Sequence, residues 1–196
     1  MMSPYFESLI KNSLTVLSDE PDDASAMVCS EVEASAELEN SDKAIYKLDL
    51  IDKEVLLEEI EDLLAYDGIR KVKELWLDRN EFGNEGVEVL SNSSQLEKIL
   101  VLSLAHNKLT NYSAQSIAVS PYLSQLQKLF LQGNQVGLEG LKALTESETL
   151  SNLKLLYLNL NPIGSAGAKI LAGDSKLQSL EELYLQKSGL ALEGVK

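Results

Sequence analysis

Basic residues and cysteine are both scarce in this sequence. The chain of 196 residues has 17 lysines and arginines against 31 aspartates and glutamates, a formal net charge of −14. Nucleic acids and anionic membranes attract proteins through a basic face, so this balance argues against both as partners. The single cysteine, Cys29, cannot form an internal disulfide, which is typical of a reducing compartment. We therefore expect a cytoplasmic protein.

Long apolar runs and a basic leader before an apolar segment are also missing, so the sequence predicts neither a membrane span nor a signal peptide. The acidic residues gather at the front of the chain. Residues 1–45 contain ten acids and two bases, whereas residues 72–196 contain thirteen acids and eleven bases. The excess negative charge is therefore largely a property of this first segment.

The residues that usually carry out catalysis are sparse as well. The one histidine, His106, is expected at the surface, and Cys29 has no histidine near it in the sequence. No phosphate-binding loop is present, and no histidine, cysteine or carboxylate cluster has the spacing of metal ligands. The sequence thus predicts a protein that is not an enzyme, with no catalytic residue, metal, cofactor or small-molecule substrate.

What the sequence does contain is an internal repeat with a period of about 27 residues. Four asparagines recur at this interval, and Ser188 takes the next place; each is preceded by Leu-x-Leu, as Leu129 and Leu131 precede Asn134. An apolar residue follows two positions later, and further apolar residues follow ten and sixteen positions later. The pattern extends back to Leu48 and Leu50, which gives about six copies. The repeated asparagines are Asn80, Asn107, Asn134 and Asn161.

Each column of the repeat has a physical interpretation. Leu-x-Leu predicts a short strand with one buried face. The asparagine side chain both donates and accepts hydrogen bonds, so the four asparagines are expected to bond the backbone of adjacent turns in a ladder. Apolar residues three apart then predict a helix that packs on the sheet. One such unit cannot bury its own apolar face, so the units are expected to stack as an α/β solenoid over residues 46–196.

This pattern resembles the leucine-rich repeat, in its helix-containing ribonuclease-inhibitor-like subtype. The resemblance is seen in LWLDRNEFGNEGVEVL, LSLAHNKLTNYSAQSI, LFLQGNQVGLEGLKAL and LYLNLNPIGSAGAKIL. It implies a curved horseshoe with parallel strands on the concave face and helices on the convex face. Compact stand-alone members of the family also resemble effector proteins that intracellular bacteria deliver into host cells, which makes a host cell the alternative location.

The two ends of the chain depart from the repeat. Residues 1–45 form an acidic extension in which 19–42 are expected to be disordered. A short helix is expected over 5–17, either lying on the end of the solenoid or serving as a partner-binding or secretion-related segment. The last repeat stops at Lys196, where its helix would begin, so we expect it to be incomplete.

The residue between each pair of leucines points out of the core, because strand side chains alternate. This outward column contains four aromatic residues, and exposed apolar patches and aromatic residues are typical of binding sites. Four buried aromatics would cover on the order of 600–1,000 Å², comparable to one side of a standard interface, about 800 Å². The alternative is that the rings only stabilise the sheet. The candidate partner-binding residues are Trp76, Phe130, Tyr157, Tyr184, Leu155, Gln132 and Asn159.

These observations predict a non-enzymatic module that binds a partner protein through its concave face. Two alternatives stay open. One is a regulator of a partner enzyme, either an inhibitor or a GTPase activator. The other is an adaptor, delivered as a bacterial effector, whose acidic extension recruits further proteins.

Overall fold

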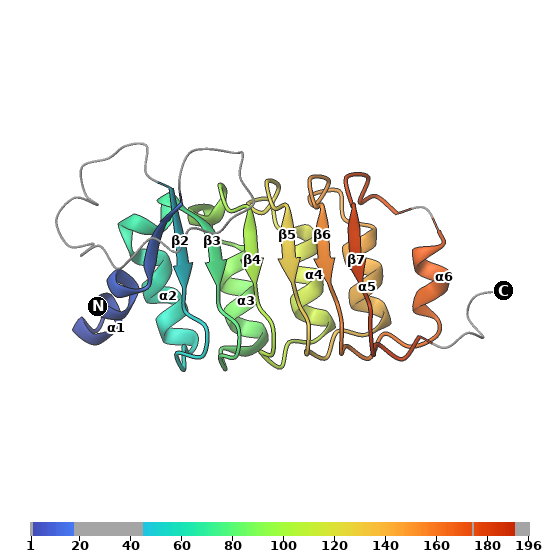
Figure 1. Ribbon diagram of the computed structural model, residues 1–196, viewed down its shortest axis with the longest axis horizontal. Coiled ribbons are helices and arrows are strands. Elements are labelled where there is room, and N and C mark those ends of the chain that lie inside the picture. Colours follow the sequence, from blue (N-terminus) through green and yellow to red (C-terminus); the bar gives the residue numbers. More distant parts are fainter. Residues whose placement is uncertain (1, 18–44, 174, 191–196) are drawn as a thin grey trace.

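A single seven-stranded sheet organises the chain, with its strands in sequence order from β1 to β7. The computed structural model describes residues 2–17, 45–173 and 175–190. Figure 1 shows the strands side by side in one row, with α1 (Pro4–Asn12) at one end and α6 (Gly167–Leu171) near the other. The strands are β1 (Leu14–Leu17), β2 (Ile45–Asp49), β3 (Val72–Trp76), β4 (Val101–Ser103), β5 (Lys128–Phe130), β6 (Leu155–Tyr157) and β7 (Glu182–Tyr184).

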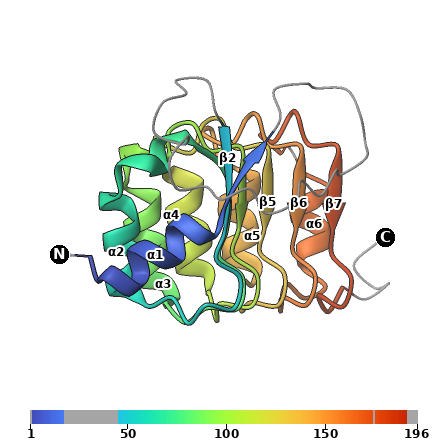
Figure 2. The same ribbon diagram turned by 60° about the vertical axis from the view of Figure 1, so that its left-hand side comes forward.

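Helices α2 to α6 lie on one face of this sheet, and α1 lies across its N-terminal end (Figures 1 and 2); the described residues leave the other face open. We call this open surface the sheet face. Every pairing from β2 to β7 is parallel, and each strand leads to a helix before the next strand begins. The predicted α/β solenoid is therefore confirmed. The helices are α1 (Pro4–Asn12), α2 (Leu57–Ala65), α3 (Gly83–Ser91), α4 (Asn111–Val119), α5 (Leu138–Thr145) and α6 (Gly167–Leu171), with short 3-10 helices at Asp67–Lys71 and Ser94–Leu96.

The core follows the leucine columns. Leu75, Leu102, Leu129 and Leu156 pair in register from β3 to β6 and are almost completely buried. The second leucine of each pair is buried beside them, and the apolar residues of the helices close the other side. Because one unit exposes a leucine face that only the next unit covers, stacking of the units supplies most of the apolar burial.

The asparagines bond the backbone of adjacent turns, as the four hydrogen bonds of Asn134 illustrate. Its Oδ1 accepts from the backbone N–H groups of Asn107, at 2.9 Å, and Leu109, at 3.0 Å. Its Nδ2 donates to the carbonyl oxygens of Leu104 and Leu131, at 3.0 and 2.9 Å. Equivalent bonds to neighbouring turns are made by Asn80, Asn107 and Asn161.

The first residues of the chain join the sheet rather than forming one longer helix. The sequence predicted a helix over 5–17, but the helix ends at Asn12, and Leu14–Leu17 form β1, antiparallel to β2. The β-branched pair Thr15 and Val16 favours an extended backbone, and the pairing satisfies backbone groups that would otherwise be unpaired at the edge of β2. Phe6 and Ile10 of α1 are buried in the core.

Two expectations about the ends fall outside the described residues. They concern disorder over 19–42 and the missing helix of the last repeat. Within the described residues, none of the helices combines the length and apolar character needed to cross a bilayer.

Candidate functional site

The outward column lies on the sheet face in strict register. The pairings align Trp76 with Ser103, Ser103 with Phe130, Phe130 with Tyr157, and Tyr157 with Tyr184. Because the leucines on either side of each residue point into the core, these side chains point away from the helices. We call the four rings of Trp76, Phe130, Tyr157 and Tyr184 the aromatic ladder.

Neighbouring rings of the aromatic ladder are in contact. The ring centroids of Tyr157 and Tyr184 lie 4.1 Å apart with planes 6° from parallel. Those of Phe130 and Tyr157 lie 4.9 Å apart at 22°. Trp76 and Phe130 come within 5.4 Å at 32° although a strand separates them. The two rings approach across the small, fully buried Ser103, so the ladder is continuous from β3 to β7.

This packing changes the surface that the sequence predicted. The column was expected to be open to water, but every ring of the ladder is half-buried. Stacked rings cover one another's faces, so solvent meets mainly ring edges and hydroxyl groups. The area left for a partner is therefore smaller than the sum for four separate aromatic side chains, and part of the stacking stabilises the sheet itself.

Charged groups stand at both ends of the ladder. At the β3 end, the Lys47 Nζ lies 4.7 Å from the Trp76 ring centroid and 3.1 Å from the Asp49 carboxylate. The Trp76 Nε1 donates to Glu74 at 3.3 Å.

At the β7 end, the Tyr184 hydroxyl donates to the Glu182 carboxylate at 2.6 Å. This bond, with a smaller contribution from Tyr157, raises the pKa of Tyr184 well above its ordinary value. The carboxylate accepts a hydrogen bond from the neutral hydroxyl, and its negative charge opposes ionisation of Tyr184. The hydrogen bond also keeps Glu182 close to the ring.

Two rows of side chains flank the ladder on the sheet face. Leu155 precedes Tyr157 by two residues and is half-buried. Gln132 and Asn159 follow Phe130 and Tyr157 by two residues, on the other flank. Their oxygens, Gln132 Oε1 and Asn159 Oδ1, are buried and have no hydrogen-bond partner among the described residues. Unpaired buried acceptors are rare in folded proteins, so these two amides are distinctive.

Asp78 lies in the same flanking row, but its carboxylate already accepts hydrogen bonds from the protein itself. One oxygen accepts from the Ser103 hydroxyl and from the Ala105 backbone N–H, the latter at 2.9 Å. The register thus brings together all seven residues predicted as partner-binding candidates, on β3, β5, β6 and β7 and the residues that follow these strands. Sequence reasoning missed the contributions of Lys47, Glu74 and Glu182, although each precedes a member of the outward column by two residues.

The groups considered for catalysis do not gather. His106 is exposed, and its ring lies against Gly133. Cys29 lies outside the described residues. Among the residues that the structure describes, no group of three or more histidine, cysteine or carboxylate side chains is placed to hold a metal ion.

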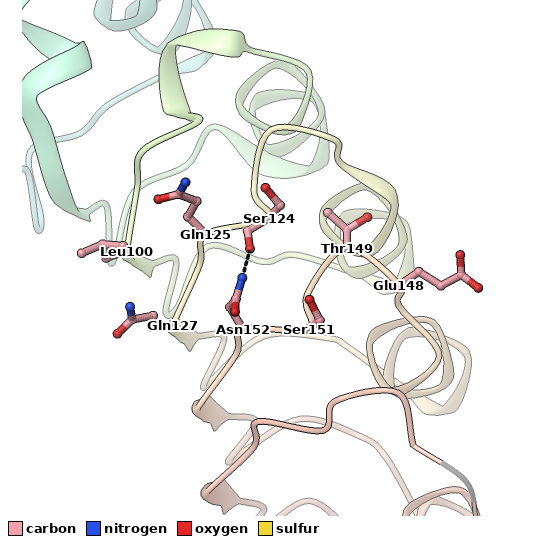
Figure 3. A pocket seen from close by; sticks show the side chains of 8 residues that line it. All are labelled: Leu100, Ser124, Gln125, Gln127, Glu148, Thr149, Ser151 and Asn152. Atoms are coloured by element: carbon pink, nitrogen blue, oxygen red, sulfur yellow. Dashed lines mark hydrogen bonds between the residues drawn. The ribbon is translucent and has the colours of Figure 1, made fainter.

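A depression lies away from the ladder, along the loops that lead into β5 and β6 (Figure 3). It is lined by Leu100, Ser124, Gln125, Gln127, Glu148, Thr149, Ser151 and Asn152. Asn152 Nδ2 donates to the Ser124 carbonyl at 2.8 Å, and Glu148 pairs with Lys176. No pattern in the sequence singled out these residues.

Comparison with known proteins gives one family. Residues 68–91, 123–144 and 149–172 match the family described as Leucine Rich repeat. No curated protein matches the chain. A solved structure, Leiomodin-1 Actin-Binding Site 2 (ABS2), is similar at 19% sequence identity with a TM-score of 0.49; the similarity covers 66% of this chain and 78% of that one.

Proposed function

We propose that this leucine-rich-repeat solenoid is a non-enzymatic module that binds a partner protein on its sheet face. Leucine-rich repeats generally serve as scaffolds for protein interaction, which supports the class of function. The observation that carries the proposal is the aromatic ladder of Trp76, Phe130, Tyr157 and Tyr184.

The fold does not require rings at these positions. Ser103 occupies the same column in β4, and Asp49 occupies it in β2; both strands pair in the same sheet without an aromatic residue. The leucine core lies on the opposite side of the strands. Aromatic residues therefore gather on the sheet face beyond what the repeat needs, and aromatic residues are enriched at the centres of protein interfaces.

The surroundings of the ladder fit an interface better than a catalytic centre. Leu155 extends the apolar surface beside Tyr157, while the half-buried amide side chains of Gln132 and Asn159 line the other side. An apolar centre with hydrogen-bonding groups around it is the usual composition of a protein interface. The one histidine, His106, is an exposed residue at the turn after β4 and lies outside the ladder.

Two finer features belong to the same proposal. We assign the repeats to the ribonuclease-inhibitor-like subtype because α3, α4 and α5 are regular helices of nine, nine and eight residues. We also place the protein in the cytoplasm or, as an effector, in a host cell, since its single cysteine leaves it independent of an internal disulfide.

A matched pair of variants tests the proposal. The full chain is immobilised to capture a partner, and the affinity of the purified partner is then measured by calorimetry. Tyr157→Ala removes a ring from the sheet face, whereas Tyr112→Ala removes a tyrosine from the outer side of α4, where it is 47% exposed. A hot-spot ring contributes about 2 kcal/mol or more, so Tyr157→Ala should weaken binding about thirtyfold.

Tyr112→Ala should leave the affinity unchanged. Urea denaturation of both variants shows the fraction that is folded, and the affinities are corrected for it. If Tyr157→Ala binds the partner as tightly as Tyr112→Ala does, the sheet face is not the binding site.

A further inference from the structure

The ring faces of the aromatic ladder differ in what covers them. The faces of Phe130 and Tyr157 are each covered on both sides by neighbouring rings. Trp76 is covered on one side by Phe130 and on the other by the Lys47 ammonium. For Tyr184, the described residues supply only Tyr157, on one side. Its second face is the single ring face of the ladder that neither a ring nor a cation of the described residues covers.

The Trp76 end shows how this protein closes the ladder where it can. The Lys47 ammonium lies over the Trp76 ring at 4.7 Å from its centroid, and the Asp49 carboxylate pairs with that ammonium at 3.1 Å. A cation over an aromatic face is attracted by the negative charge density of the ring. A carboxylate beside the ring fixes the cation in place, so the arrangement consists of a ring face, a cation and an anion.

The Tyr184 end has two of these three components. Glu182 precedes Tyr184 by two residues, which places both side chains on the sheet face, and its carboxylate accepts from the Tyr184 hydroxyl at 2.6 Å. A carboxylate has two oxygens that accept several hydrogen bonds, so this one bond leaves capacity for a second donor. No ion pair within the described residues involves Glu182.

We propose that the sheet face accepts a basic segment of the partner protein, and that an arginine of this segment stacks on the open face of Tyr184 and pairs with Glu182. The inference rests on the proposed function, because it names the chemistry of the partner at the same site. A guanidinium suits this place better than an ammonium, since it is planar, stacks on aromatic faces and donates two hydrogen bonds to one carboxylate.

The dimensions and the charge of the protein fit such a segment. Four strand spacings of about 4.8 Å separate Trp76 from Tyr184, so a segment that follows the ladder spans roughly 19 Å. That is about six residues of extended chain. The net charge of −14 raises the rate at which a basic segment meets the protein, and most of this charge lies in residues 1–71, outside the part of the chain that contains the ladder.

The experiment compares two peptides that differ in charge alone. Each has about six residues, the length of the ladder in extended chain, with glycine alternating either with arginine or with citrulline, which has the shape of arginine without its charge. Trp76 is the only tryptophan, so its fluorescence reports on the ladder. Amide resonances of Glu182 and Tyr184 report on the proposed arginine position. The arginine peptide should shift these resonances, and the citrulline peptide should bind at least tenfold more weakly.

Matched substitutions then separate this position from general attraction between opposite charges. Glu182→Gln removes the carboxylate at the ladder, and Glu85→Gln removes an exposed carboxylate on α3, away from the sheet face. Charge-assisted hydrogen bonds are about twice as strong as neutral ones. Glu182→Gln should therefore lower the affinity for the arginine peptide about tenfold. Glu85→Gln should change its affinity less than twofold. Tyr184→Phe retains the ring face and should retain most of the affinity, whereas Tyr184→Ala should abolish the resonance shifts.

Equal affinity for the two peptides, or equal effects of Glu182→Gln and Glu85→Gln, would overturn the inference. The captured partner distinguishes this failure from failure of the proposed function. If Tyr157→Ala weakens binding of the partner but Glu182→Gln does not, the sheet face binds a partner that places no arginine at Tyr184. If Tyr157→Ala leaves the partner bound, the proposed function itself is wrong.

Discussion

Tyr157 and Tyr184 stack with their ring centroids 4.1 Å apart and their planes 6° from parallel, although their α-carbons belong to different strands. The spacing of paired strands, about 4.8 Å, is close to the distance at which two aromatic rings stack. Identical positions in successive repeats therefore bring rings into contact without distortion of the backbone. The ladder is in this sense a consequence of repeat geometry, and it contributes to stability before any partner binds.

Replacing Tyr157 by alanine should consequently lower the free energy of unfolding as well as partner binding. Tyr157 contacts Phe130 on one side and Tyr184 on the other. Each aromatic contact contributes about 0.5–1.5 kcal/mol, so we expect a loss of about 1–3 kcal/mol in urea denaturation. Leu158→Ala, in the buried core, should cost about 2–5 kcal/mol. If Tyr157→Ala costs no more than Tyr112→Ala on the outer side of α4, the ring contacts contribute nothing.

Replacing Asn134 by alanine should be among the most destabilising changes in the chain. The substitution leaves two backbone N–H groups and two carbonyl groups without their partner, in a site that is 6% exposed. An unpaired buried group costs about 1–3 kcal/mol, so we expect the free energy of unfolding to fall by roughly 3 kcal/mol or more.

Asn152→Ala is the control for this change, because Asn152 is an exposed asparagine with one hydrogen bond, to the Ser124 carbonyl. It should cost under about 1 kcal/mol. Similar losses in the two variants would mean that the ladder bonds of Asn134 contribute little to stability.

The repeat made much of this architecture predictable. Leucine columns at one fixed interval determine the strands, and the buried Asn134 lies at the turn that its column predicted. The reason is physical: each column has the same environment in every unit, so one interpretation is tested several times within one sequence.

Regions outside the repeat lack that internal check. Leu14 and Leu17 fit one face of a helix, and the pairing with β2 that makes this segment a strand involves residues far along the chain. Nothing local in the sequence indicates that pairing. The contact between Trp76 and Phe130 across Ser103 could likewise not be predicted. The sequence shows on which face of the sheet a side chain lies but not which rotamer it adopts.

A second repeated column was visible but was not interpreted. Ser120 and Ser147 stand one repeat apart, each at the same distance after its anchor asparagine. The Ser120 hydroxyl donates to the Ser91 carbonyl, and the Ser147 hydroxyl donates to the Ala118 carbonyl, each at 2.5 Å. These serines connect adjacent units near the ends of the helices, as the asparagines do at the turns after the strands. Their spacing alone was sufficient to find them.

The ionisation of Tyr184 should show that Glu182 lies at the end of the ladder. The hydrogen bond to Glu182 raises the pKa of Tyr184 above its ordinary value. For a group whose pKa is higher in the folded state, the stabilisation is present below the ordinary tyrosine pKa, about 10, and is lost as the pH rises through the raised value. An alkaline titration followed by near-ultraviolet absorbance, with Tyr184→Phe as the reference, isolates this group.

Glu182→Gln should lower the pKa of Tyr184 toward the ordinary value, because it removes the negative charge that opposes ionisation. Glu85→Gln on α3 should leave the titration unchanged. A Tyr184 pKa that is the same with glutamate or glutamine at position 182 would contradict the hydrogen bond seen between the two side chains.

Gly133, in the turn after β5, is constrained both by its backbone conformation and by a neighbouring side chain, and a final test separates the two. Gly133 has φ of +68°, and a Cβ on it would collide with the ring of His106. Gly164 occupies a turn with φ of +73°, and a Cβ there would meet nothing within 4 Å. A left-handed backbone costs about 1–2 kcal/mol for a residue other than glycine. Gly164→Ala should therefore cost about that amount in urea denaturation, and Gly133→Ala should cost more.

The excess at Gly133 measures the contact with His106, and a double-mutant cycle isolates it. In a His106→Ala background the ring is absent, so the two alanine substitutions should then cost the same amount, set by backbone strain alone. The His106 side chain is exposed, so its ring can swing outward, and the excess should stay below about 1 kcal/mol. A difference between Gly133→Ala and Gly164→Ala that persists without His106 would show that the ring is not its cause.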